Sequence, residues 1–350
     1  MKILVTGGCG FIGTNLCLSL KAKGYKITAL DNFSKDGSKE NANILNRSKI
    51  PIWGYDLRKQ IPKEKFKFDA VFHLAGNGST PKSIKDPYGD FLDTALGTLN
   101  ILETVRTNKT PLVYTSTCKI YSSELNIVPT KVTETRYIWN FKSPLYKKLR
   151  LSIKEAVSKF GVNEYFPVDS VGKFAHAPYG VSHATGDLYC QEYFLMYQVP
   201  VVINRMSTIY GFYQQGSENQ GFIDWMVKSK IKNESLNLET NGKSVRDILW
   251  VDDLTDLFLE ELVQIAKVKG NVFNIGGGNK NTITIRETFK YLDSKYGGRT
   301  KLKFGPGRPA DQKIYITDIR KVKKTLNWSP KTSAYNGIDR LLNWYKMPKP

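Results

Sequence analysis

Short runs of apolar residues alternate, over the first 205 residues, with segments whose apolar positions recur every three or four residues. A short run bounded by turn residues is typical of a strand buried on both faces, and a longer periodic segment is typical of a helix packed on one face. The expected strands occupy residues 2–6, 26–30, 70–74, 112–115 and 200–205. Strands that alternate with helices favour right-handed crossovers. The pattern therefore predicts an α/β fold with a doubly wound parallel sheet.

The pattern changes after residue 205, where the expected elements become shorter and mixed. Helical periodicity recurs at residues 221–231, 253–266 and 283–296. A strand-like run lies between the last two, at residues 272–275. We expect a first domain over 1–205 and a smaller domain over 206–350 that interleaves with it. For the strand near 272–275 two placements stay open: it pairs within the second domain, or it returns to the sheet of the first domain.

Residues 122–177 interrupt the first domain as a long insertion. A helix is predicted within it from the pair Ser143-Pro144, an N-cap followed by a first-turn proline, to Gly161, which suits a helix end. Its apolar stripe comprises Leu149, Ile153, Ala156, Val157 and Phe160. Two interpretations remain open: a solvated basic helix packed over the domain, or a wall beside a ligand site.

The first expected strand runs directly into a glycine-rich turn, TGGCGFIG at residues 6–13. Its glycines allow the tight turn, the close approach of a pyrophosphate and the packing of helix on strand. The first N–H groups of the following helix then face the phosphates. Strand, turn and helix in this order predict a dinucleotide site on a Rossmann sheet. The expected contacts are Gly7, Gly10, Phe11, Ile12 and Gly13.

Acidic and small residues follow the other expected strands, at the edge where parallel sheets bind ligands. Asp31, followed by Asn32, ends the second strand, and its carboxylate would accept hydrogen bonds from the adenosine ribose and repel a 2′-phosphate. This favours NAD over NADP. The remaining expected cofactor contacts are Asp56 and Leu57 near the adenine, and Leu74, Ala75 and Gly76 beside the cofactor backbone.

Three side chains are candidates for chemistry at this edge. Thr117 lies just beyond a strand, where its hydroxyl can hydrogen-bond a substrate oxygen. Tyr179 and His183 are four residues apart, one turn on the same face of a helix. The Tyr179 phenol is expected to move a substrate proton. His73 is interpreted instead as a packed strand residue.

The composition is ordinary for a globular protein except for a formal charge of +20. This charge suits an anionic ligand, but the lysines are dispersed, so a nucleic-acid partner is not expected. No apolar run approaches about 18 residues, so no membrane span is expected. The first strand begins at Lys2, which leaves no room for a signal peptide and predicts a cytoplasmic protein. The cysteines and histidines lack the spacing of a metal site.

Two arginines of the second region are candidate anchors for an anionic substrate. Arg246 follows the turn at residues 242–245, and Arg308 lies in the glycine- and proline-rich loop 305–309. The forked guanidinium group suits hydrogen bonding to a diphosphate.

The ordered set of motifs resembles the extended short-chain dehydrogenase/reductase family, and within it the nucleoside-diphosphate-sugar epimerases, over nearly the whole chain. The motifs that carry the resemblance are the turn 6–13, Asp31-Asn32, His73-Leu74-Ala75-Gly76, Thr117, Tyr179, Arg205 with Tyr210-Gly211, Val245-Arg246-Asp247 and Trp328-Ser329-Pro330. Residues 115–121 and 308–312 are most similar to the CDP-paratose 2-epimerase group.

The resemblance implies an NAD-dependent epimerase of a nucleoside-diphosphate sugar. Tyr179 would move the proton, Thr117 would polarise the forming carbonyl, and Arg205, Arg246 and Arg308 would bind the substrate. One sugar carbon, C2 in the named group, would be oxidised and then reduced from its other face. The Asp-Glu pair of related 4,6-dehydratases is replaced by Cys118-Lys119. A homodimer or higher homo-oligomer, paired through helices near 84–108 and 179–197, is also implied.

One position departs from the family motif, which has Lys where this chain has His183. An imidazole with an unperturbed pKa near 6.5 is mostly neutral at pH 7 and would stabilise a Tyr179 phenolate less well. Three outcomes stay open: a slower epimerase that needs higher pH, a site in which another cation compensates, or a catalytically weak or silent protein that binds NAD and a nucleotide sugar.

Overall fold

The computed structural model describes residues 1–169, 174–217, 220–307 and 311–347. A parallel sheet of seven strands forms its centre, in the order β14-β10-β5-β4-β1-β2-β3. These strands are β1 (Lys2–Thr6), β2 (Lys26–Asp31), β3 (Ile52–Gly54), β4 (Ala70–His73), β5 (Leu112–Thr117), β10 (Val201–Met206) and β14 (Val272–Ile275). The predicted doubly wound α/β fold is confirmed.

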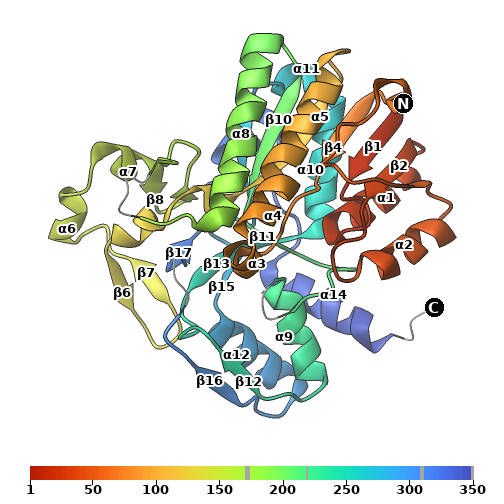
Figure 1. Ribbon diagram of the computed structural model, residues 1–350. Helices are drawn as coiled ribbons and strands as arrows, with labels where there is room; N and C mark the ends of the chain where they lie inside the picture. The colour runs from red at the N-terminus through yellow and green to blue at the C-terminus, as the bar shows by residue number, and fades with distance from the viewer. Residues whose placement is uncertain (170–173, 218–219, 308–310, 348–350) are drawn as a thin grey trace.

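Helices cover both faces of this sheet (Figure 1). One face carries α5 (Gly97–Arg106) and α8 (Ala177–Tyr197), and the other carries α1 (Phe11–Ala22), α2 (Ser38–Arg47), α10 (Val251–Val263) and α13 (Arg320–Leu326). Successive strand residues point to opposite faces. Ile3 and Val5 therefore pack with α1 and α10, whereas Leu4 packs with α5 and α8. Burial of each such side chain contributes about 1.5–3 kcal/mol.

The helical stretch predicted at 84–108 is not one continuous α-helix. It contains α4 (Pro87–Phe91), a π-helical turn η2 (Leu92–Leu96) and α5, and α3 (Thr80–Lys85) precedes it. Short 3₁₀ turns connect other elements: η1 (Lys63–Lys65), η3 (Cys118–Ile120) and η4 (Ser123–Ile127). Within the described ranges, none of the helices combines the length and apolar character needed to cross a bilayer.

Residues beyond 206 contribute to two units. The segments α10, α11 (Ile265–Val268), β14 and α13 return to the first sheet, where β14 pairs with β10. The others form a second core between sheet and helices: β11 (Thr208–Tyr210), β13 (Val245–Trp250), β15 (Thr282–Ile283), β17 (Ile314–Tyr315), α9 (Phe222–Ile231), α12 (Ile285–Tyr296) and α14 (Ala334–Lys346). Beside them β12 (Leu236–Leu238) pairs with β16 (Leu302–Phe304). The two units are therefore interleaved in sequence.

The helix predicted between Ser143 and Gly161 is wrong as a continuous element. The insertion contains α6 (Pro144–Lys147), α7 (Leu151–Ala156) and the hairpins β6 (Thr130–Val132) with β7 (Tyr137–Trp139) and β8 (Val157–Ser158) with β9 (Gly161–Val162). Arg150, which is extended between the two helices, forms an ion pair with Glu124. The Val162 N–H donates to the Ile316 carbonyl at 2.7 Å. Long-range contacts therefore override the local helical pattern.

Candidate active site

A cavity of about 1330 Å³ opens at the carboxyl ends of the parallel strands, where residues of both units meet. This is the edge at which open parallel sheets bind ligands. Most residues singled out from the sequence line it: Gly7, Gly10, Phe11, Ile12, Gly13, Asp31, Asn32, Asp56, Leu57, Leu74, Ala75, Gly76, Thr117, Tyr179, His183 and Arg246. The fold thus brings the candidate cofactor, proton-transfer and substrate residues to one place.

The glycine turn has the backbone geometry that a dinucleotide pyrophosphate requires. Gly7 has φ +63°. The Gly10 N–H donates to the Gly7 carbonyl at 2.9 Å, and this hydrogen bond closes the turn immediately before α1. A Cβ on Gly13 would lie 2.2 Å from the Gly7 carbonyl oxygen. The turn therefore cannot keep this shape with a larger residue at that position, and it leaves the start of α1 open to the cavity.

The Asp31 carboxylate is fixed at the end of β2 by two backbone donors. The Cys9 N–H donates to Oδ2 at 3.0 Å and the Phe33 N–H to Oδ1 at 2.8 Å. Burial raises the pKa of Asp31, and these two hydrogen bonds oppose that rise. Because each carboxylate oxygen can accept more than one hydrogen bond, acceptor capacity remains for ribose hydroxyls.

The adenine end of the cavity is formed just beyond β3. Asp56 accepts from the Arg58 N–H at 3.0 Å, and the Leu57 carbonyl accepts from the Asn100 amide at 2.8 Å. These bonds hold both residues in the loop that follows the strand. The sequence pattern indicates a strand that ends at residues 55–57, whereas β3 already ends at Gly54.

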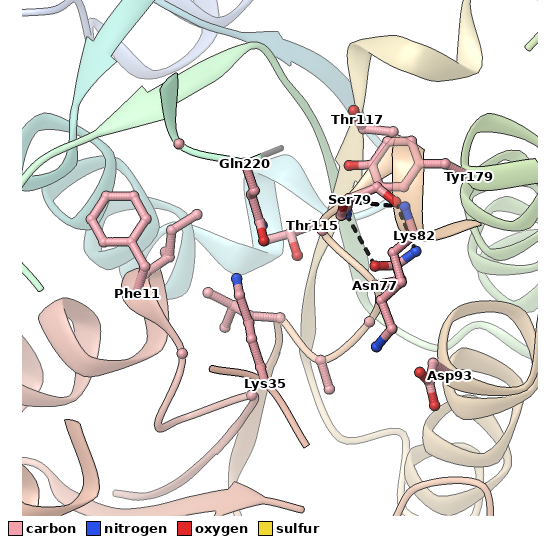
Figure 2. Close-up of a pocket in the computed structure, with 18 of the residues that line it drawn as sticks. Phe11, Lys35, Asn77, Ser79, Lys82, Asp93, Thr115, Thr117, Tyr179 and Gln220 are labelled. Atoms are coloured by element: carbon pink, nitrogen blue, oxygen red, sulfur yellow. Dashed lines mark hydrogen bonds between the residues drawn. The ribbon is translucent and has the colours of Figure 1, made fainter. Parts of the chain in front are cut away.

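Thr117 and Tyr179 meet on one wall of the cavity (Figure 2). Thr117 ends β5, and its hydroxyl accepts from the Lys119 N–H at 3.2 Å. The Tyr179 N–H donates to Ser83 Oγ at 3.0 Å, which fixes the first turn of α8 against α3. Burial raises the pKa of Tyr179 to about 12, although its hydrogen bond with Thr117 lowers it. The phenol is therefore protonated at neutral pH.

His183 lies one turn along α8, with its ring centroid 4.5 Å from that of Tyr179. Its Nε2 is 3.1 Å from the Asn77 carbonyl oxygen. Because a carbonyl only accepts, Nε2 carries the hydrogen. Burial lowers the pKa of His183. The hydrogen bond to Asn77 and the carboxylates of Asp90 and Asp187 raise it, but burial has the larger effect. The imidazole is therefore neutral and does not supply the charge of the family lysine.

The far end of the cavity contains a cluster of charged groups. Arg246 donates through Nη2 to Asp311 Oδ1 at 2.7 Å, and Lys119 Nζ contacts the same oxygen at 3.0 Å. Burial favours protonation of Asp311, but Lys119 and Arg246 hold the pKa of its carboxyl well below the usual range. Lys119 and Asp311 were not among the predicted contacts. The signal that could have found Lys119 is its place two residues beyond Thr117, at the ligand-binding edge of the sheet.

Arg205 is a correction to the sequence analysis. It is buried and does not line the cavity. Its guanidinium forms a forked pair with Asp187 at 2.8 and 2.9 Å, and its Nη1 donates to the Tyr121 hydroxyl and the Glu164 carbonyl, both at 3.1 Å. All of its nitrogens are thus used within the protein core. The prediction that Arg205 binds the substrate is therefore wrong.

Two further predictions concern residues outside the central group. Arg308 lies outside the described residues. His73 is fully buried in β4, with Nδ1 2.7 Å from Thr6 Oγ1 and Nε2 3.1 Å from Thr98 Oγ1, and burial lowers its pKa to about 3. The interpretation of His73 as a packed strand residue is confirmed.

The sequence analysis missed two lysines on the cofactor side of the cavity. Figure 2 shows Lys35 and Lys82, from the loop after β2 and from α3, both extending into it. Burial lowers the pKa of Lys35, Asp31 raises it and Lys82 lowers it. Two cations that line one cavity suit an anionic group of the cofactor. No spacing rule singles them out, because lysine is abundant along this chain.

Comparison with known proteins agrees with this arrangement. A family model described as the NAD dependent epimerase/dehydratase family matches residues 3–145 and 160–276. The chain is 32% identical to CDP-paratose 2-epimerase of Salmonella typhi, with 98% of this chain and 99% of that protein covered. It is 26% identical to UDP-glucuronate 4-epimerase of Thermodesulfobacterium geofontis, with 98% and 95% covered.

Solved structures share the fold over the whole chain. UDP-glucuronic acid 4-epimerase from Bacillus cereus, in complex with UDP-glucuronic acid and NAD, matches with a TM-score of 0.78 at 24% identity, and 99% of each chain is covered. Pal from Bacillus thuringiensis matches with a TM-score of 0.80, also at 24% identity and 99% coverage of each chain. The glycine turn, the fixed Asp31 and the residues after β3 and β4 fit NAD. The chain therefore belongs to the NAD-dependent epimerase/dehydratase family, with NAD as its cofactor.

Proposed function

We propose that this protein is an NAD-dependent epimerase of a nucleoside-diphosphate sugar that inverts C2, like the CDP-paratose 2-epimerase to which it is similar. The observation that carries the proposal is the set of residues that line one cavity: Thr117 and Tyr179 line it together with the glycine turn and Arg246. One bound ligand could therefore contact a group for proton transfer, the cofactor site for hydride transfer and a guanidinium for diphosphate binding.

In this proposal Tyr179 holds the proton that the sugar hydroxyl loses and later regains. The Thr117 hydroxyl, which is hydrogen-bonded to Tyr179, donates to the same sugar oxygen as it becomes a carbonyl. The glycine turn and Asp31 would hold NAD, which would supply the hydride acceptor for the oxidation and the hydride donor for the reduction. Asp31 orients the adenosine end through ribose hydroxyls, and Arg246 binds the diphosphate. Because the proton and hydride both return, there is no net oxidation.

The residues beside Thr117 favour epimerisation over elimination of water. Elimination requires an acid and a base beside the oxidised sugar. The two positions after Thr117 hold Cys118, whose pKa is raised by burial to about 11, and Lys119, which is paired with Asp311. Neither provides a free carboxyl group. A dehydratase is therefore the less favoured reaction.

A second candidate function is a catalytically weak or silent protein that binds NAD and a nucleotide sugar. The observation that favours it is the neutral His183 beside a Tyr179 whose pKa is about 12. Such a protein would retain the cofactor and bind nucleotide sugars without converting them.

The two functions are separated by product analysis. The purified protein is denatured to identify its released cofactor, and the native protein is incubated with CDP-, UDP- and dTDP-linked hexoses while sugar signals are followed by NMR. The epimerase proposal predicts released NAD and the appearance of a second C2 epimer. Nucleotide-sugar binding with no new sugar signal over a pH range of 7–10 would favour the silent alternative.

We also propose that the protein forms a homodimer through α8 and α4. Both helices expose large apolar side chains, which include Leu188 and Val181 at 50% and 56% exposure and Phe91 at 50%. A face of this kind is typical of a surface that associates with another chain. Sedimentation velocity should give twice the monomer mass, and Leu188→Lys should return the protein to the monomer mass.

A further inference from the structure

A single carboxylate oxygen at the substrate end of the cavity binds two cations. Asp311 Oδ1 lies 2.7 Å from Arg246 Nη2 and 3.0 Å from Lys119 Nζ. The cations come from different units of the fold, Arg246 from β13 and Lys119 from η3, directly after β5. All three residues line the cavity. Their side chains are thus directed at one point that a ligand can reach.

The protein holds Asp311 at this point through its neighbours. The Asn126 amide donates to the Asp311 carbonyl at 2.8 Å, and the Gln312 side chain donates to the Tyr121 carbonyl at 2.9 Å. The segment that follows β5 and the segment around Asp311 are therefore tied together. The Asp311 side chain nevertheless keeps 37% of its surface exposed, more than Lys119 at 23% or Arg246 at 13%. Of the three charged groups, the carboxylate is therefore the most accessible to a ligand that enters the cavity.

We propose that Lys119 and Arg246 form the site for the sugar-proximal phosphate of a nucleoside diphosphate, and that the Asp311 carboxylate occupies this site until the ligand displaces it. This deepens the proposed function and rests on it. A phosphate oxygen and a carboxylate oxygen accept the same charge-assisted hydrogen bonds. A diphosphate carries more negative charge than one carboxylate, so it gains more from two cations.

Nucleotide binding tests the site without any turnover. The full-length protein with its bound cofactor is titrated with CDP and with CMP by calorimetry, for the wild type, Lys119→Gln, Lys119→Arg and Asp311→Asn. Lys269→Gln, an exposed lysine outside the cavity, is the matched control. Lys119→Gln should bind CDP about tenfold more weakly than the wild type, or weaker still, because one charge-assisted hydrogen bond is lost. CMP, which lacks the second phosphate, should bind to Lys119→Gln as it does to the wild type.

The other variants test displacement and charge. Asp311→Asn should bind CDP about fivefold more tightly, because the competing charge of a partly exposed pair is removed. Lys119→Arg should retain CDP affinity. Equal CDP affinity of Lys119→Gln and wild type, an equal loss of CDP and CMP, or weaker CDP binding by Asp311→Asn would each overturn the proposal. Selective loss of CDP in Lys119→Gln without any sugar epimerisation would support the phosphate site and reject the epimerase function, so the two failures are distinct.

Discussion

Replacement of His183 by lysine should restore the charge that Tyr179 lacks. The two side chains lie one helical turn apart, with ring centroids separated by 4.5 Å. An ammonium group at roughly 5 Å from the phenol oxygen, at an effective dielectric constant of about 20, stabilises the phenolate by about 3 kcal/mol. At 1.36 kcal/mol per unit this lowers the pKa by about 2 units. The pKa of Tyr179 would fall from about 12 to between about 9 and 10.

This shift has a definite sign in the pH profile. In the proposed mechanism the Tyr179 phenolate is the proton acceptor, so the wild-type rate should rise about tenfold per pH unit between pH 7 and 10. In His183→Lys the same rise should level off about 2 units earlier, and kcat at pH 7.5 should increase about 10- to 100-fold, because burial of the ammonium offsets part of the gain. The assay is the initial rate of epimer formation against pH. His183→Gln, which is polar and neutral, is the matched control and should show no gain. An unchanged or lower rate in His183→Lys, with NAD content and fold intact, would refute the reasoning.

Three further variants test separate parts of the structure. Arg205→Ala should lower the free energy of unfolding by about 3–5 kcal/mol in urea titrations, because Asp187 is left buried without its partner; unchanged stability with weaker substrate binding would restore the rejected ligand role. Glu261→Gln should stabilise the protein by about 3 kcal/mol at pH 7 and by little near pH 4.5. Burial raises the pKa of Glu261 from 4.5 to about 8, so between these pH values the unfolded chain is ionised at this position while the folded protein keeps its proton, and stability falls as the pH rises. Equal gains at both pH values would contradict this. Gly13→Ala should lose bound NAD, measured as cofactor released per protein, because its Cβ would lie 2.2 Å from the Gly7 carbonyl oxygen; full retention of NAD would count against the turn as the pyrophosphate site.

The sequence was sufficient for features that depend on local chemistry. The strand of residues 272–275 and the helix at 222–231 follow from short-range periodicity, and the glycine turn follows from its own backbone requirements. Tyr179 and Thr117 were found because each has a fixed relation to the end of one element. For such residues, the neighbours along the chain determine the position.

Prediction from the sequence was wrong where contacts between segments far apart in the chain determine the structure. The helix expected up to Gly161 ends early because Val162 pairs with Ile316, more than 150 positions away. Arg205 lies near the carboxyl end of its strand, as a ligand-binding residue would, but its Nε and Nη2 both donate to Asp187 on α8. The ion pair of Lys119 with Asp311 likewise joins segments of the two units that are far apart in the chain, so local sequence does not predict it.

The central claim is that Tyr179 takes and returns a sugar proton while hydride passes to NAD and back within one cavity. The most direct measurement follows a CDP-linked hexose by NMR in D₂O, with the wild type and Tyr179→Phe. The account predicts a second epimer, inverted at C2, that carries no solvent deuterium at that carbon, and no epimer with Tyr179→Phe. Deuterium at the inverted carbon, or undiminished epimerisation by Tyr179→Phe, would contradict it.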